Sequence, residues 1–178
     1  MKIFLKTKEE IAIMRQGGYL LAKIFDHLVK KIKPGVSTKE LEEIAFNLIY
    51  QNKAKPAFLG QDGFPSCLCT SLNEEIVHVL PSKRVLKEGD ILKLDLGIIW
   101  KGFYLDKAAT FSVGKISSLA RKLIKTTEKC LKEGIKKAKP GNFLGDIGWT
   151  IERCAKKNGF NVIRSLGGHG IGRSLHEP

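Results

Sequence analysis

The sequence lacks several features that mark membrane, secreted or disulfide-rich proteins. No run of apolar residues approaches the ~20 residues that a membrane-spanning helix requires. The first residues, Met1–Lys6, lead directly into polar sequence and are too short for a secretory signal peptide. The four cysteines form no Cys-x-x-Cys pair, which argues against a disulfide framework and a cysteine zinc site. We therefore expect a reduced cytoplasmic protein without a membrane partner, folded as one domain over 1–178.

Acidic residues are scarce relative to basic ones. Lys and Arg number 31 against 18 Asp and Glu, which gives a formal net charge of +13. Such an excess favours polyanionic partners such as RNA or the surface of the ribosome. The lysines are spread along the predicted helices rather than gathered into one tract, so a solvated lysine-rich surface is the simpler interpretation. No feature indicates specific DNA binding.

The predicted elements combine helices and strands in an α+β order. Thr7 and Glu10 form a capping box, as do Ser37 and Glu40, so each pair is expected to begin a helix. Pro-Gly pairs are expected to stop the helices that precede them. The expected elements are helices over 7–33 and 37–52, strands near 56–59, 67–71 and 75–79, a hairpin to about 113, helices over 117–139 and 142–158, and strands near 161–165 and 171–175.

A faint internal repeat runs through this order. Lys30–Gly35 recurs as Lys136–Gly141 at an offset of 106 residues, and each copy is followed by a predicted helix that ends at an asparagine. A Lys-Pro-Gly motif alone ends many helices, but the repeated order of elements favours a duplication. The hairpin at 91–111 is then expected to recur at about 198–218, so the second half of the duplication is expected to be incomplete.

Two aspartates in the predicted hairpin are the first candidates for chemistry. If Lys101-Gly102 form a two-residue turn, Asp95 faces Ala108 and Asp106 lies diagonal to Asp95 on the same face of the sheet. Two carboxylates within apolar strands are costly unless a cation lies between them. The pair therefore predicts a metal site.

Three of the four histidines extend this prediction. His169 lies among four glycines, where a ligand or metal could approach the backbone closely, although a phosphate-binding loop is an alternative. His78 near a strand end and His176 near the last residue would carry little weight alone. Oxygen and imidazole ligands suit Mn, Fe, Co or Zn, and two such ions would need more carboxylates than Asp95 and Asp106.

The motifs taken together are more specific than any one of them. They are Lys6-Thr7-x-Glu9-Glu10-Ile11-x-x-Met14-Arg15-x-Gly17-Gly18, Asn73-Glu74-x-x-Val77-His78, Leu86-x-x-Gly89-Asp90-Ile91, the Asp95/Asp106 spacing, and Gly168–Arg173 followed by His176-Glu177-Pro178. In these motifs the chain resembles the type I methionine aminopeptidases of the M24 metallopeptidase family over essentially its whole length. The resemblance implies the pita-bread (creatinase/aminopeptidase) fold, a pseudo-twofold duplication of helices on a curved antiparallel sheet.

The resemblance also implies roles for individual residues. Asp95 would bind one of two divalent ions (Co, Mn, Fe or Zn), Asp106 would bridge both, and His169 would bind the other. His78 would contact the substrate and assist proton transfer, and His176 would hydrogen-bond the scissile carbonyl. The family has two further glutamate ligands, one of them a general base, beyond the point where this sequence stops. We therefore expect impaired hydrolysis by this chain alone.

The substrate pocket implied by the resemblance is apolar. It would draw on Phe58, Phe64, Cys69 and Leu175, residues for which plain core packing is the alternative interpretation. Gln61 stands where an aromatic residue is common in the family, and Val79 stands where glycine is usual. These departures leave the implied metal ligands intact.

The expected function is removal of the initiator methionine from nascent polypeptides, with a small second residue preferred. A proline-specific peptidase of the same fold is one alternative. The other alternative is a non-catalytic pita-bread module that binds RNA or the ribosome, an interpretation that the basic charge and the missing glutamates support.

Overall fold

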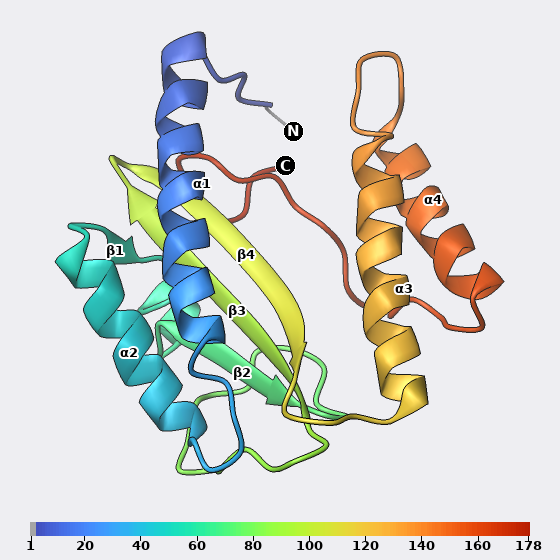
Figure 1. Ribbon diagram of the computed structural model, residues 1–178. Coiled ribbons are helices and arrows are strands. Elements are labelled where there is room, and N and C mark those ends of the chain that lie inside the picture. Colours follow the sequence, from blue (N-terminus) through green and yellow to red (C-terminus); the bar gives the residue numbers. More distant parts are fainter. Residues whose placement is uncertain (1–2) are drawn as a thin grey trace. The chain divides into compact units, whose positions relative to one another are not determined.

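The computed structural model describes residues 3–178 and divides them into two compact units (Figure 1). The first, which we call the sheet unit, comprises the residues before Ile116 together with His169–Pro178. The second, the helical unit, comprises Ile116–Gly168. The described helices include none that is both long enough and apolar enough to cross a bilayer. The expected α+β composition is confirmed, and the single catalytic domain over 1–178 stays a prediction.

The sheet unit contains two helices and an antiparallel sheet whose central strand is β3. β4 pairs with β3 along one side, and β1 and β2 pair with different parts of β3 along the other. A short 3-10 helix, η1, lies between β1 and β2. The bounds are α1 Lys8–Val29, α2 Thr38–Gln51, β1 Lys55–Pro56, η1 Gln61–Gly63, β2 Leu68–Leu72, β3 Ile91–Trp100 and β4 Phe103–Ser112.

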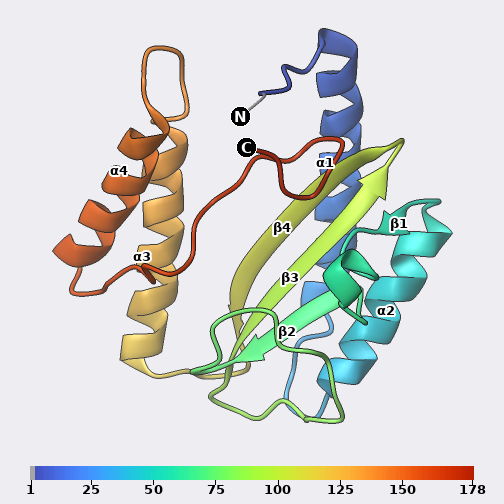
Figure 2. The same ribbon diagram turned by 180° about the vertical axis from the view of Figure 1, so that it is seen from behind.

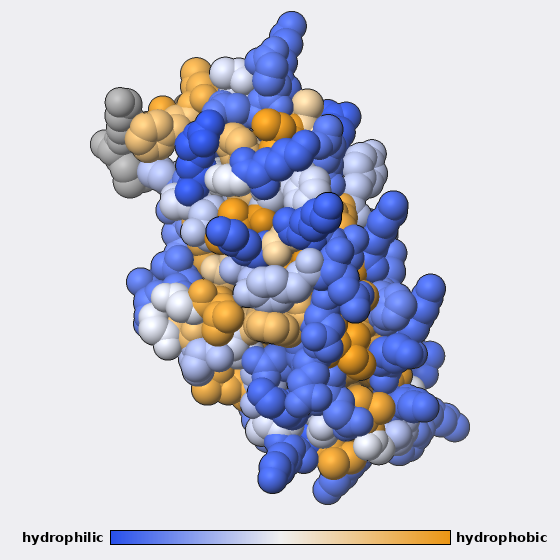
Figure 3. All heavy atoms as spheres, turned by 90° about the vertical axis from the view of Figure 1, so that its left-hand side faces the viewer, coloured by the Kyte–Doolittle hydropathy of each residue, from blue (hydrophilic) through white to orange (hydrophobic). Residues whose placement is uncertain are grey.

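The alternation of β3 separates a core face from an open face. Leu92, Leu94, Leu96 and Ile98 are fully buried in the core that α1 and α2 form with the sheet. Asp95 lies between them in the sequence and therefore points to the opposite face. Figures 1 and 2 show α1 and α2 covering one face and the C-terminal segment crossing the other. The face of the molecule seen in Figure 3 is largely hydrophilic, with scattered hydrophobic patches.

The helical unit consists of α3 (Ser118–Ile135) and α4 (Leu144–Lys157), which pack against each other. Gly134 of α3 has no room for a side chain, because a Cβ there would lie 2.9 Å from the Cδ1 atom of Ile151 in α4. The absent side chain therefore lets the two helices approach closely.

The two helix pairs repeat each other in detail, as the offset of 106 residues predicts. Gly35 and Gly141 both adopt a left-handed backbone, with φ of 92° and 87°. Asn52 is the C-cap residue that ends α2, and Asn158 is the C-cap residue that ends α4; each side-chain amide donates a 2.8 Å hydrogen bond to the carbonyl four residues earlier. Corresponding residues therefore make the same local contacts, which supports the duplication.

Two of the predicted helices end earlier than expected. The first ends at Val29 rather than near residue 33, and the third ends at Ile135 rather than near residue 139. Both lie several residues before a proline, Pro34 or Pro140, and a proline disfavours helical backbone at the residue before it. The chain therefore leaves each helix through tight turns before it reaches the proline.

The start of α4 is also displaced by one residue. Phe143 rather than Asn142 is the N-cap residue, because its backbone N–H donates a 2.8 Å hydrogen bond to the carboxylate of Asp146. The Asn142 side chain donates instead to the carbonyl of Lys137 at 2.9 Å. The Asn142 side chain therefore bonds to the preceding turn and does not cap the helix.

Three predicted strands are wrong within the described residues. The segment 75–79 is irregular, since His78 has a φ of 60° and extended backbone is interrupted there. The segments 161–165 and 171–175 also form no strand, and an isolated bridge between Gly170 and Glu177 closes the C-terminal segment into a loop. Alternating apolar residues predict strands only where a partner strand accepts the backbone hydrogen bonds. The strand near 56–59 is present but short, at Lys55–Pro56.

Adjacent glycines in α1 give a matched test of how this helix meets the sheet. A Cβ at Gly17 would lie 2.6 Å from the Cδ2 atom of Leu105 and 3.0 Å from the Cβ atom of Trp100, whereas Gly18 has nothing within 4 Å. We expect Gly17→Ala to lower the free energy of unfolding by about 1–2 kcal/mol through overpacking. Gly18→Ala should raise it by about 0.5–1 kcal/mol through helix propensity. Urea unfolding measures both, and equal stabilisation by the two substitutions would contradict this packing.

Candidate metal centre and substrate cavity

The β3–β4 hairpin places the two aspartates on the open face of the sheet. Lys101 and Gly102 have φ of 49° and 83°, the left-handed pair of a two-residue turn, so the predicted turn is confirmed. In the resulting register Asp95 pairs with Ala108 and Asp106 pairs with Gly97. The two carboxylates are therefore diagonal neighbours on one face, as expected from the sequence.

The aspartates are poorly compensated by the protein. Each has a buried Oδ1 atom that receives no hydrogen bond from the described residues. Burial and the negative charge of Asp106 raise the pKa of Asp95 to about 7. This environment disfavours two negative charges, and a cation between the carboxylates would remove the penalty.

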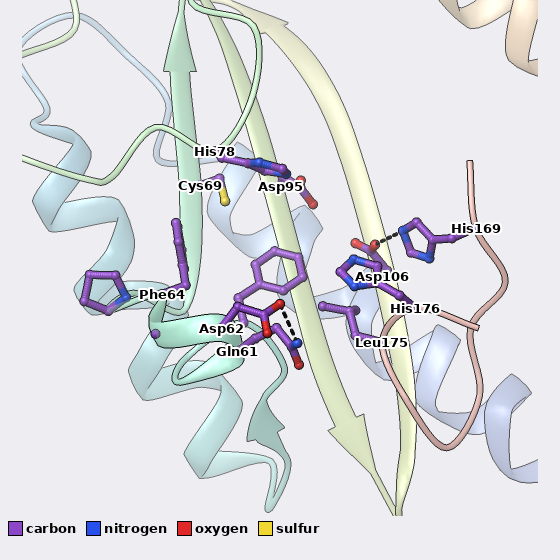
Figure 4. A pocket seen from close by; sticks show the side chains of 13 residues that line it. Gln61, Asp62, Phe64, Cys69, His78, Asp95, Asp106, His169, Leu175 and His176 are labelled. Carbon is purple, nitrogen blue, oxygen red and sulfur yellow. Dashed lines mark hydrogen bonds and ion pairs between the residues drawn. The ribbon is translucent and has the colours of Figure 1, made fainter. Parts of the chain in front are cut away.

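The C-terminal loop brings two histidines to the same place. The Nε2 atom of His169 lies 3.9 Å from Oδ2 of Asp106, and its Nδ1 atom lies 2.9 Å from the carbonyl oxygen of Gly170. Because a carbonyl oxygen only accepts, Nδ1 carries the proton, and Nε2 of the neutral ring keeps its lone pair. The His176 ring packs edge-on against His169 with centroids 4.5 Å apart. Figure 4 shows both rings beside Asp106.

A cavity of about 460 Å³ connects these groups with an apolar cluster. Phe58, Cys69 and Leu175 are buried and pack together with Ala57, and Phe64 packs against them. Burial raises the pKa of the Cys69 thiol to about 12, and the negative charges of Asp95 and Asp106 act in the same direction, so the thiol stays neutral. All nine site residues predicted from the sequence line the cavity: Phe58, Phe64, Cys69, His78, Asp95, Asp106, His169, Leu175 and His176.

The cavity also has lining residues that sequence reasoning missed. They are Asp62 and Gly63 of η1 and Pro65, the residue after Phe64; Gln61, noted in the sequence as a departure from the family, lines the cavity beside them. Asp62 has a φ of 49°, and its carboxylate accepts a 2.9 Å hydrogen bond from the Gln61 side chain (Figure 4). The glycine pair at positions 60 and 63, both left-handed, is the sequence signal for this tight turn.

A buried carboxylate holds the C-terminal loop in position. Glu177 forms an ion pair with Lys6 and accepts a 2.7 Å hydrogen bond from the backbone N–H of Arg173. Arg173 in turn pairs with Glu10 of α1 at 2.7 Å. Glu177 is thus engaged in positioning the loop that carries His169 and His176, a role that its place near the last residue did not suggest.

The donor set fits part of a metal site. The buried oxygens of Asp95 and Asp106 are free, and the Nε2 lone pair of His169 faces Asp106. Carboxylate oxygen with imidazole nitrogen is a donor set typical of Mn, Fe, Co or Zn. Over residues 3–178, however, no group of three His, Cys, Asp or Glu side chains is arranged so that it could hold a metal ion. The three predicted ligands are therefore neighbours rather than a preassembled site.

Comparisons with known proteins identify the family to which the chain belongs. The sequence pattern of Metallopeptidase family M24 matches residues 12–178. Methionine aminopeptidase 1 of Bacillus subtilis is 44% identical over 175 residues, which are 98% of this chain and 71% of that protein. The crystal structure of methionine aminopeptidase from Rickettsia prowazekii superimposes with a TM-score of 0.97 at 36% identity, over 99% of this chain and 71% of that one.

A more distant structure shares the fold of this chain at a lower sequence identity. Prolidase from Pyrococcus furiosus has a TM-score of 0.86 at 25% identity, and the match covers 97% of this chain but 50% of that one. The pita-bread fold inferred from the sequence is confirmed, because the methionine aminopeptidase and prolidase neighbours share it. The methionine aminopeptidases match this chain with higher identity and over more of their own length than the prolidase does, which favours them over the proline-specific alternative. The chain belongs to metallopeptidase family M24 and, within it, to the methionine aminopeptidases.

Proposed function

We propose that this protein removes the N-terminal methionine from polypeptides by metal-dependent hydrolysis, with a small second residue preferred. One observation carries the proposal. Two aspartates with unsatisfied buried oxygens stand at one side of a cavity whose other side is an apolar cluster. Such a cavity suits an apolar side chain held next to a peptide bond that is to be cleaved.

Asp95, Asp106 and His169 would hold two divalent ions, Co, Mn, Fe or Zn, together with the two glutamates that the family resemblance implies. When bound, such ions lower the pKa of water and polarise a carbonyl group. The uncompensated aspartates favour a cationic ligand at this side of the cavity. The protein itself would thus supply negative charge, orientation and exclusion of bulk water.

The apolar cluster and the remaining histidines would position the substrate. Phe58, Phe64 and Leu175 would contact the methionine side chain, and the tight fit would exclude larger side chains. His78 and His176 line the cavity and can donate hydrogen bonds to the scissile carbonyl oxygen or move a proton to the leaving amine. Nascent polypeptides in the cytoplasm, at the ribosome surface, are the proposed substrates.

The proposal is tested with the 178-residue chain and with a chimera. The chimera adds the part of the Bacillus subtilis relative that this chain does not match, since the match covers 71% of that protein. With added Mn²⁺, the chimera should release methionine from a Met-Ala-Ser peptide, and a chelator should abolish release until metal is restored. The chain alone should be much weaker. A folded, metal-loaded chimera that leaves the peptide intact would overturn the proposal.

A further inference from the structure

The positive charge of the protein is concentrated in the helical unit. Residues 116–168 hold 12 of the 31 basic residues but only 4 of the 18 acidic ones, so they contribute +8 of the net +13. A fold needs no such imbalance, and a lysine-rich solvated surface would place acidic residues among the basic ones. The helical unit is therefore the strongly basic part of the chain.

Four lysines of α3 and Lys136, its C-cap residue, form a row along one side of the helix. Lys122, Lys125, Lys129, Lys132 and Lys136 are spaced alternately three and four residues apart, and all five are exposed. At 100° per residue they fall within about 80° of the helix circumference and extend over about 21 Å of its length. We call these five residues the lysine row.

Only one lysine of the row is ion-paired among the described residues, and the acidic residues Glu128 and Glu133 lie beside four of the five lysines. Among residues 3–178, ion pairing engages Lys136, which lies 2.7 Å from Glu133, and none of the other four. Lys122 lies over the Phe160 ring at 5.4 Å from its centroid. Like charges three or four residues apart destabilise a helix, so the row is a cost to folding that an anionic partner would offset.

Two surface grooves follow the lysine row. One of about 500 Å³ is lined by Lys125, Lys129, Lys132 and Lys136 together with Glu128, Glu133 and Ile135. The other, of about 440 Å³, is lined by Lys122, Lys125 and Lys129 with Arg121, Ser118, Thr126 and Asn158. In the second groove the ammonium groups lie beside hydroxyl and amide groups, which also donate hydrogen bonds to phosphate oxygens, whereas the first groove holds four lysines and two glutamates.

From this charge complementarity we propose that the lysine row binds the phosphate backbone of RNA without sequence preference. A linear series of cations about 5 Å apart suits the regularly spaced charges of a nucleic-acid strand better than it suits an isolated anion. No aromatic side chain lies among the groove-lining residues, so stacking on bases is not part of the proposed contact. This binding is independent of the proposed peptidase activity, because none of these residues lines the cavity.

The test compares two triple variants of the full chain that lose the same charge. Lys125→Gln/Lys129→Gln/Lys132→Gln removes the centre of the lysine row. Lys30→Gln/Lys31→Gln/Lys33→Gln removes three exposed lysines of the sheet unit. Binding of a fluorescein-labelled 20-nucleotide single-stranded RNA is measured by anisotropy between 50 and 300 mM salt, and circular dichroism confirms that both variants fold.

The row variant should bind at least tenfold more weakly at 50 mM salt, and its slope of log affinity against log salt should shrink by about 2, since each lost phosphate contact removes about 0.7. The control variant should keep the slope of the unmodified chain. Equal losses in both variants would show that only total charge matters and would overturn the proposal. Absence of RNA binding with capture by phosphatidylserine vesicles would also overturn it and assign the row to a membrane surface. A row variant that unfolds is replaced by the single Lys129→Gln change, with an expected slope change of about 0.7.

Discussion

Replacing Asp95 with asparagine is expected to stabilise the metal-free protein and to abolish its metal-dependent hydrolysis. At pH 8 the Asp95 carboxylate is ionised beside Asp106, and its buried oxygen has no hydrogen-bond donor. The asparagine removes one charge and offers an amide that can donate to Asp106. We expect the free energy of unfolding to rise by on the order of 1–3 kcal/mol, the usual penalty of an unsatisfied buried group.

When a divalent ion is present, we expect the unmodified protein to be more stable than Asp95→Asn. Mn²⁺ should raise the melting temperature of the unmodified protein by mass action and should leave Asp95→Asn unchanged. Loss of a supporting partner of a ligand typically costs 10–100-fold in metal affinity, so loss of the ligand itself should lower hydrolysis by the chimera at least about 100-fold. Calorimetry with and without Mn²⁺ measures the first effect, and peptide release measures the second.

Asp90 supplies a matched control for this substitution. Its carboxylate accepts 2.9 Å hydrogen bonds from the Asn73 side chain and from the backbone N–H of Lys87. Asp90→Asn should therefore destabilise the protein by about 1 kcal/mol and preserve the response to Mn²⁺. If Asp95→Asn also destabilises the metal-free chain, the two carboxylates do not destabilise the metal-free protein, and this explanation of the site is wrong.

The second large effect is expected at Phe58, which lines the cavity and is 8% exposed. Phe58→Ala should lower the free energy of unfolding by about 3 kcal/mol, at the lower end for a buried phenylalanine because part of the freed space opens to the cavity. The wider pocket should also lose about 10–200-fold of the preference for methionine over smaller side chains. Phe46→Ala is the control, since Phe46 is 40% exposed and contacts Tyr50, and it should cost less than about 1 kcal/mol.

A double substitution separates packing from other causes. A Cβ at Gly97 would lie 2.7 Å from the Cε1 atom of Phe58 and 2.9 Å from the Cβ atom of Ala57, so Gly97→Ala alone should overpack this site by about 1–3 kcal/mol. Phe58→Ala/Gly97→Ala removes the first of these contacts and keeps the second. Urea unfolding should show the double variant at least about 1 kcal/mol more stable than the sum of the single effects. Additive effects would mean that the ring does not pack on β3 at Gly97.

Local chemistry explains the parts of the fold that could be predicted from the sequence. The capping boxes at Thr7 and Ser37 are formed as expected, and the Lys101-Gly102 turn determines the hairpin register and hence the shared face of Asp95 and Asp106. Each of these features depends on residues close together in the chain. The repeat at an offset of 106 residues was visible for the same reason, since its two copies have the same turn and cap residues.

Features that depend on distant partners could not be predicted in this way. The segment 171–175 has a strand-like pattern, but the ion pair of Glu177 with Lys6 and the bridge to Gly170 hold it as a loop. Asp62 gave no signal as a cavity residue, because its position depends on a left-handed turn folded back over the sheet. For the apolar pocket residues, the family resemblance rather than the pattern itself supplied the prediction.

The sequence by itself thus determined the family, most of the element order and the shared face of the two aspartates, because motifs and turns depend on residues that are close together in the chain. Only the tertiary structure decided that Asp95 and Asp106 keep unsatisfied oxygens, that the Nε2 atom of His169 lies near Asp106, and that Phe58, Cys69 and Leu175 pack together. The physical reason is burial, since a carboxylate is costly only where the surrounding fold removes water and supplies no donor.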